Sequence, residues 1–453
     1  MKPRIRLLAV LVAALFGTTT AWGQSDTITI IHVNDTHSTL APIGPRNASL
    51  EGTLGGIARA ATLIAMLQAT NPNSIFLHAG DFSIGDLFYN VYFGVPELRI
   101  LSSLGCKAMA VGNHEWDLTP STLLASLDSG FVGGRFPLLS ANTILDDPAV
   151  RPMKKYIQPC VIENAGGIRV GIFGLTTPAT NILSQPAPAV VDTPFKYAAA
   201  MVESLTAKGC RVIVCLSHLG FSLDRVLAGM IPGIHVIVGG PDHIPLARPV
   251  PVANGSDTTW IVQAGGFYLD VGRLRLRVAG GKVRLLDYAL LPVDASIPEE
   301  PAIKQIVSSL IAGIEKVHGP LFSKQIAVSR GFVKEVADSL MLRTEGSTPV
   351  GRLVTDAFRD LTGTQVAIEP GGCTANPLYE GPVTGSDLFR VVGYGFNTDD
   401  GLGYHLVRFD MSGASLLAGL TFGLSDIASD DEFYLQASGL ARPSLVTSFG
   451  IRA

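Results

Sequence analysis

Cysteine and charged side chains are scarce in this chain of 453 residues, and each scarcity argues against a class of protein. Five cysteines are scattered through apolar segments without a CxxC pair, and their odd number leaves at least one thiol unpaired. This pattern favours buried cysteines that act as small apolar side chains over a disulfide framework, and it gives no support to cysteine-ligated zinc. The cysteines are Cys106, Cys160, Cys210, Cys215 and Cys373.

Basic side chains are also too few for a protein that binds nucleic-acid polymers. Charged residues make up only 16% of the chain, and 34 Lys and Arg face 38 Asp and Glu, for a formal net charge of −4. Proteins that bind nucleic acids neutralise phosphates with a surplus of basic side chains. We therefore expect no nucleic-acid polymer among the partners.

Only the amino terminus carries a long apolar run. The run LLAVLVAALF follows Lys2, Arg4 and Arg6 and precedes a small-x-small site at 21–23. This order is typical of a secretory signal peptide, here residues 1–23, and the run is too short to cross a bilayer. An amino-terminal anchor is the alternative. We expect a secreted or periplasmic protein without a membrane anchor after cleavage, with a net charge of about −7 because the lost segment is basic.

The length and the 47% hydrophobic content suggest two domains with sizeable cores. Residues 26–293 alternate strand and helix patterns, and apolar residues recur at helical spacing in 55–70 and 196–209. A linker at 294–324 begins Pro-rich and ends as an amphipathic helix. The second domain is expected at 325–453.

Five short polar segments each follow directly after an apolar, strand-like run. Such runs are typical of buried strands in a parallel sheet, whose carboxyl ends meet at one edge where ligands bind. Carboxylate, imidazole and neutral amide groups together suit a site for two divalent metals. Any one segment alone is also compatible with a buried structural role, but five in order predict the metal site. Their polar side chains include Asp35, His37, Asp81, Asn113, His114, Asp117, His218 and His243.

The motif GNHEWD at 112–117 and the order of these segments resemble the 5′-nucleotidase family of metallophosphoesterases. The resemblance implies an α/β fold, a four-layer α/β/β/α sandwich followed by a smaller α/β domain. It also implies two divalent metal ions, which could be Zn, Mn, Mg or Fe. Five of the residues above would be ligands. Asp35 and His37 would hold one metal, Asn113 and His218 the other, and Asp81 would bridge both.

By the same resemblance, His114 is the catalytic imidazole and Asp117 orients it. Phosphate ester hydrolysis is slow because negative charge accumulates on the attacking and leaving oxygens. Two cations can stabilise both oxygens and lower the pKa of a bound water. A carboxylate on one ring nitrogen can fix the tautomer of an imidazole that protonates the leaving group. The implied reaction is attack by a metal-bound hydroxide.

The fifth segment departs from the family pattern. Proline occupies position 241, where the family usually has a histidine ligand, and a proline side chain cannot coordinate a metal. His243 matches the second, more variable ligand position. Two interpretations remain open: Pro241 leaves the second metal weakly held, or Asp242 or His243 fills the vacancy.

The second domain carries looser similarities. Residues 348–363 resemble the segment that opens the family's substrate domain. Gly371 and Gly372 match a glycine loop that lets substrate approach the backbone closely. Glu369 stands where asparagine is usual, and Thr374 replaces an arginine expected to bind the substrate by charge-assisted hydrogen bonds.

Two aromatic residues and the end of the chain complete the pattern. Phe396 and Tyr394 are candidates to stack on a base, although both could equally be core residues. The segment FYLQASGL at 433–440 matches the family, but a later Gly-Asp-Gly-aromatic segment has no counterpart, so we expect a shortened domain.

The sequence therefore predicts a secreted dimetal phosphoesterase that hydrolyses a phosphomonoester, such as a nucleoside 5′-phosphate or a related nucleotide. The alternatives are a phosphatase or cyclic phosphodiesterase for another small phosphate ester, and a catalytically impaired member that only binds ligand. The sequence indicates no oligomeric state.

Overall fold

The computed structural model describes residues 26–255, 257–335, 347–425 and 434–440. The predicted signal peptide and residues 441–453 lie outside these ranges. In the part of the chain that is described, every helix is too short or too polar to cross a membrane.

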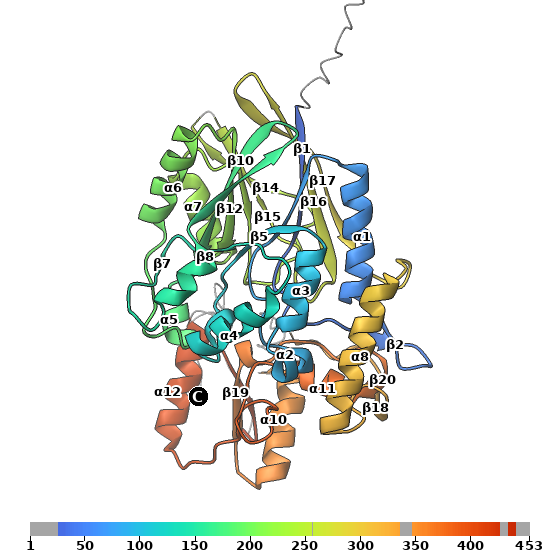
Figure 1. Cartoon of the computed structure of the whole chain (residues 1–453). Coiled ribbons are helices and arrows are strands. Elements are labelled where there is room, and N and C mark those ends of the chain that lie inside the picture. Colours follow the sequence, from blue (N-terminus) through green and yellow to red (C-terminus); the bar gives the residue numbers. More distant parts are fainter. Residues whose placement is uncertain (1–25, 256, 336–346, 426–433, 441–453) are drawn as a thin grey trace, which may run out of the picture.

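Two mixed sheets face each other in the first domain (Figure 1). The first has the strand order β17-β16-β1-β4-β5-β6-β8, parallel from β1 to β8. Its strands are β1 Thr27–Val33, β4 Ser74–His78, β5 Cys106–Ala110, β6 Leu138–Leu139, β8 Ile157–Gln158, β16 Asp270–Ala279 and β17 Lys282–Pro292.

The second sheet has the order β14-β15-β13-β12-β10-β9 and is parallel from β15 to β10. Its strands are β9 Cys160–Ala165, β10 Ile168–Thr176, β12 Val212–His218, β13 Val236–Val238, β14 Val250–Asn254 and β15 Asp257–Val262. Short pairs form at the rims: β2 Ile43–Arg46 with β3 Gly52–Leu54, and β7 Thr143–Ile144 with β11 Val190–Val191.

Helices cover both outer faces, and the sheets bury an apolar core between them. The helices α1, α3, α4 and α8 pack on the first sheet, while α6 and α7 pack on the second. This arrangement confirms the predicted four-layer α/β/β/α sandwich. The helices are α1 Ile57–Thr70, α2 Leu87–Tyr92, α3 Val95–Ser103, α4 Pro120–Gly130, α5 Thr180–Leu183, α6 Phe195–Ala207, α7 Phe221–Met230 and α8 Pro301–His318.

The predicted helical periodicity is confirmed at α1 and α6. In α8 the Glu300 carboxylate caps the helix by accepting a hydrogen bond from the Ile303 N–H at 2.7 Å. Ile303, Val307 and Ile314 are buried on one face. This helix, expected in the linker, packs against α1 and α2 and so joins the outer layer of the first domain.

The second domain is built from short elements below the sandwich in Figure 1. Strand β18 Gln325–Ser329 pairs with β20 Gly381–Thr384, and β19 Ala367–Pro370 pairs with β21 Leu435–Ser438. The helices are α10 Pro349–Thr362, α11 Gly385–Val391 and α12 Gly413–Ser425, and short 3-10 turns are η1 His114–Trp116, η2 Arg151–Lys155 and η3 Gly371–Cys373. The core of this domain is small: Val350, Val354, Leu378, Val383 and Val391.

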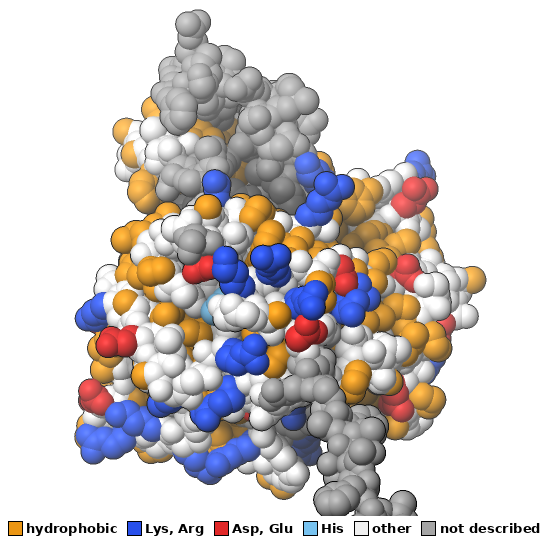
Figure 2. All heavy atoms as spheres, turned by 90° about the horizontal axis from the view of Figure 1, so that it is seen from above, with side chains coloured by type: hydrophobic (Ala, Val, Ile, Leu, Met, Phe, Trp, Pro, Cys, Tyr) orange, Lys and Arg blue, Asp and Glu red, His pale blue; other side chains and the backbone are white. Residues whose placement is uncertain are grey.

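The surface seen from above in Figure 2 agrees with the composition. Lys and Arg side chains are scattered over this face among acidic, hydrophobic and neutral ones, and they form no continuous basic patch there.

Candidate active site

The predicted metal ligands lie just beyond the carboxyl ends of strands from both sheets. Asp35 follows β1 and Asp81 follows β4 in the first sheet, whereas His218 is the last residue of β12 in the second. Their ligand atoms gather in two groups, within each of which all donors lie within 4.8 Å of one another. The strand ends of two facing sheets therefore meet at one site.

Four predicted ligands adopt a backbone conformation that non-glycine residues rarely take. The φ angle is 50° at Asp35, 48° at His37, 56° at Asp81 and 54° at His243. Such conformations persist where surrounding contacts enforce them, and they concentrate at functional sites. Glu115 supplies one such contact, because its carboxylate accepts a hydrogen bond from the Asp81 N–H at 3.1 Å.

The first group contains Asp35, His37 and His243. His37 Nδ1 lies 3.1 Å from the Ser83 carbonyl oxygen and 3.0 Å from that of Ile84. Carbonyls only accept, so Nδ1 carries the proton and Nε2 keeps its lone pair. The Nε2 atom of His37 lies 3.0 Å from His243 Nε2. Burial and the neighbouring His243 hold the pKa of His37 well below its usual value, and burial lowers that of His243 to about 4, so both imidazoles are neutral ligand forms.

The second group contains Asp35, Asp81 and His218, all fully buried. His218 Nδ1 donates to the Ala79 carbonyl at 2.8 Å, and Nε2 lies 2.9 Å from Asp81 Oδ2. A neutral imidazole would therefore turn a lone pair toward a carboxylate oxygen, so a proton or a cation is needed between them. Burial disfavours the protonated form, but the Asp81 carboxylate outweighs it and raises the pKa of His218 to about 10.

Two buried oxygen atoms fit the same cation chemistry. Asp35 Oδ1 and Asn113 Oδ1 have no hydrogen-bond partner among the described residues. An unpaired buried polar atom costs about 1–3 kcal/mol, so these oxygens call for a ligand that the described part of the chain does not provide. The donor set of carboxylates, neutral imidazoles and one amide suits divalent ions, and the residues fit the implied metals.

The predicted catalytic pair is formed beside these groups. His114 Nδ1 lies 2.6 Å from Asp117 Oδ2, and the His114 backbone N–H donates to Asp81 Oδ1 at 3.0 Å. Burial alone would lower the pKa of His114, but Asp117 and Asp81 raise it to about 10. The side chain is 23% exposed. The imidazole is thus protonated at neutral pH and partly open to solvent.

The two polar residues of the fifth segment, Asp242 and His243, have different contacts. His243 joins the first group, whereas the Asp242 carboxylate accepts a hydrogen bond from the Phe221 N–H at the start of α7. Among the described residues, the second group contains no donor from residues 240–243. Asp242 therefore caps a helix where the sequence left open a role as ligand.

A buried network that sequence reasoning missed supports the loop between Asp35 and His37. The Thr36 hydroxyl donates to Glu97 Oε1 at 2.7 Å and lies 3.0 Å from His78 Nε2. Burial raises the pKa of Glu97 to about 7 and lowers that of His78 to about 3. Glu97 lies on α3, and no local pattern links it to a loop 61 positions earlier.

The second domain brings Tyr394 to the site. Its ring stacks on His114 with centroids 4.7 Å apart and planes 15° apart, and its hydroxyl lies 3.5 Å from His37 Nε2. Phe396, the other aromatic candidate, packs against Phe93 at 5.8 Å.

The predicted glycine loop lies in η3. The N–H of Gly371 donates to the Tyr434 carbonyl at 2.6 Å, and Gly372 is exposed. Thr374, which replaces the expected arginine, donates its hydroxyl to the Gly371 carbonyl at 2.8 Å. The threonine thus stabilises the loop and adds no charge for a substrate.

Comparisons with known proteins agree with this geometry. Residues 28–245 match the family model for calcineurin-like phosphoesterase, and residues 329–443 match that for the 5′-nucleotidase C-terminal domain. A snake venom 5′-nucleotidase from Naja atra is 32% identical over 67% of this chain and 60% of that protein. A 5′-nucleotidase from Diplobatis ommata is 26% identical over 91% of this chain and 74% of that protein.

A solved structure matches a larger share of both chains than the snake venom protein does. The crystal structure of a 5′-nucleotidase precursor from Thermus thermophilus is 32% identical, with a TM-score of 0.78, over 91% of this chain and 81% of that one. The chain nevertheless spans less than two thirds of the snake venom protein's length. The shared sequence and fold show that this chain belongs to the 5′-nucleotidase family of metallophosphoesterases.

Proposed function

We propose that the protein is a dimetal phosphoesterase that hydrolyses a phosphomonoester, with a nucleoside 5′-phosphate or a related nucleotide as substrate. The observation that carries the proposal is the meeting of two ligand groups, with Asp35 common to both, beside the His114–Asp117 pair. The names of the relatives support the choice of substrate.

The residues divide the work between two ions. Asp35, His37 and His243 would hold one ion, and Asp35, Asp81 and His218, with Asn113, would hold the other. Two divalent cations in these positions would neutralise charge on the attacking and leaving oxygens and lower the pKa of a bound water. By the family resemblance Asp81 would bridge the two ions, and among the described residues Asp35 is the donor that belongs to both groups. The identity of the metal is left to experiment.

His114 transfers the proton. Its Nδ1–H is held by Asp117, so Nε2 is the nitrogen left for the phosphoryl group or the leaving oxygen. When protonated, this imidazole stabilises negative charge on the phosphoryl oxygens and can protonate the departing alkoxide. Asp117 keeps the ring in the orientation that this step needs.

Tyr394 supports a substrate with a planar group, because its ring already lies against the site on the second domain. Thr374 favours the second candidate, a phosphatase or cyclic phosphodiesterase for another small phosphate ester, because the expected arginine is missing. Pro241 favours a catalytically impaired, ligand-binding member, because it removes a predicted ligand of the second ion.

We also propose that the protein acts outside the cytoplasm, in the periplasm or after secretion. The basic start, the short apolar run and the small-x-small site at 21–23 support this placement. Amino-terminal sequencing of the secreted protein should begin at Gln24. An amino terminus that retains residues 1–23 in a membrane fraction would support the anchor instead.

Hydrolysis of three substrates tests the proposal, followed as phosphate release from the two monoesters and as para-nitrophenol release from the diester. Protein loaded with Mn²⁺ or Zn²⁺ should hydrolyse para-nitrophenyl phosphate and AMP, and His114→Ala should abolish most of both activities. Hydrolysis of bis(para-nitrophenyl) phosphate without hydrolysis of AMP would select the diesterase alternative. Metal binding without turnover of any ester would select the ligand-binding alternative, and failure to bind metal would refute the proposal.

A further inference from the structure

Arg390 belongs to the second domain, yet its charged group is buried against the first. It lies on α11, and its Nε donates to Asp86 Oδ2 at 2.5 Å, with side chains 3% and 0% exposed. Removing one partner of a buried ion pair leaves the other charge uncompensated, which is strongly destabilising. The two side chains therefore hold their elements firmly in place.

Asp86 is the last residue of the loop 81–86, which also contains the two backbone carbonyls that contact His37. It caps α2 by accepting a hydrogen bond from the Phe88 N–H at 3.4 Å. Two and three residues earlier, the carbonyls of Ile84 and Ser83 accept the Nδ1–H of His37. These bonds select the tautomer that leaves Nε2 as the ligand atom, as partners of metal-bound histidines commonly do.

The same loop also contacts the second domain directly, at Gly85 next to His37. A Cβ atom at Gly393 would lie 2.2 Å from the Gly85 carbonyl oxygen, so the two backbones touch. A Cβ atom at Gly85 would in turn lie 2.8 Å from His37 Cβ. The backbones of the two domains and the His37 side chain are thus in continuous contact.

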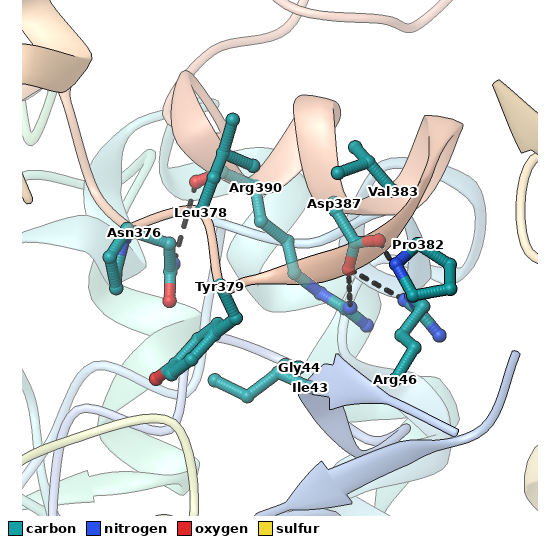
Figure 3. A pocket seen from close by; sticks show the side chains of 11 residues that line it. Ile43, Gly44, Arg46, Asn376, Leu378, Tyr379, Pro382, Val383, Asp387 and Arg390 are labelled. Atoms are coloured by element: carbon teal, nitrogen blue, oxygen red, sulfur yellow. Dashed lines mark hydrogen bonds and ion pairs between the residues drawn. The ribbon is translucent and has the colours of Figure 1, made fainter. Parts of the chain in front are cut away.

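Arg46 contacts α11 next to Arg390, as Figure 3 shows. Its Nε and Nη2 each lie 2.6 Å from a carboxylate oxygen of Asp387, and Arg390 Nη1 lies 3.8 Å from Asp387 Oδ1. These residues line a small cavity that is partly open to solvent. The lining of this cavity includes none of the predicted metal ligands.

We infer that Arg390 is a positioning residue for His37. Acting through Asp86, it holds the loop 81–86 so that the Ser83 and Ile84 carbonyls fix the tautomer and the direction of the His37 ring. The inference rests on the proposed function in taking His37 as a ligand of the first metal. It makes the first metal site depend on a residue of the other domain, 353 positions later in the chain.

The test compares four variants with the parent protein. Arg390→Met removes the charge and keeps the length of the side chain, and Asp86→Asn removes the partner's charge at constant shape. Arg390→Lys keeps a cation for Asp86. Arg46→Met is the matched control, since it breaks an ion pair at the same domain boundary without touching the loop 81–86.

Two readouts follow the role of His37 directly. In metal-free protein labelled with ¹⁵N-histidine, the His37 signals, assigned by loss in His37→Gln, should show the Nδ1–H tautomer in the parent and a mixture in Arg390→Met. In titrations with Mn²⁺, Arg390→Met and Asp86→Asn should bind the first ion about 10–100-fold more weakly. Arg390→Lys and Arg46→Met should stay close to the parent, and Arg390→Met should recover kcat at saturating Mn²⁺.

Each contrary outcome has a distinct meaning. An unchanged His37 tautomer and Mn²⁺ affinity in Asp86→Asn would overturn the inference, even if Arg390→Met failed to fold. Equal losses in Arg390→Met and Arg46→Met would also overturn it, because both would then reflect only the domain boundary. A parent protein that binds no Mn²⁺ would refute the proposed function itself.

Discussion

His32, a buried histidine of β1, should make the protein lose stability in acid. The side chain is 0% exposed, and neither ring nitrogen has a hydrogen-bond partner among the described residues. The ring stacks on Tyr288 with centroids 6.0 Å apart and lies directly over Gly272, where a Cβ would be 1.9 Å from Nε2. Burial lowers the pKa of His32 to about 3.

The sign and size of the effect follow from proton linkage. Between pH 6.5 and 3 the unfolded chain protonates this imidazole and the folded chain does not. The free energy of unfolding therefore falls with falling pH, by about 1.4 kcal/mol per pH unit for one such group. From about pH 6.5 to about pH 4.5 the loss is about 2 kcal/mol, and it vanishes at higher pH, where both states are neutral.

Replacement of His32 by leucine should remove this loss. In urea unfolding with a chelator present, the stability difference between His32→Leu and the parent should grow by about 2 kcal/mol between about pH 6.5 and about pH 4.5. The control is His405→Leu, at a side chain that is 64% exposed, which should follow the parent at every pH. A difference for His32→Leu that is the same at both pH values would refute the reasoning.

Three further predictions concern the site and the second domain. His114→Ala should lower turnover about a hundredfold while metal content stays constant; parallel loss of metal would make His114 a ligand. Pro241→His should tighten the second metal and raise activity at limiting metal, because Asp242 is engaged at α7; two ions retained by the dialysed parent would contradict a weak site. Limited proteolysis should cleave within 325–453 before 26–293, because the second core is small; equal resistance would mean that the domain closes alone or through a partner.

Local sequence patterns predicted the features that lie within a single strand, helix or turn. The apolar runs before Asp35, Asp81 and His218 are strands β1, β4 and β12, and apolar periodicity located α1. The GNHEWD turn holds its predicted pair because His114 and Asp117 are only three positions apart. Short separations of this kind can be predicted from spacing alone.

Features that depend on distant parts of the chain could not be predicted in this way. The apolar run of β12 does not indicate that this strand belongs to a different sheet from β1. The sequence alone does not show that Asp242 lies beside the start of α7, where its carboxylate accepts the Phe221 N–H. Arg390 and Asp86 meet across 304 positions, and only the packing of two domains brings them together.

The most direct test of the account is a diffraction experiment on crystals grown with saturating Mn²⁺, with anomalous differences used to locate the ions. The account predicts two peaks, one in contact with His37 and His243 and the other with His218 and Asn113, with Asp35 and Asp81 between them. A single peak, or peaks away from these side chains, would contradict the dimetal site on which the proposed function rests.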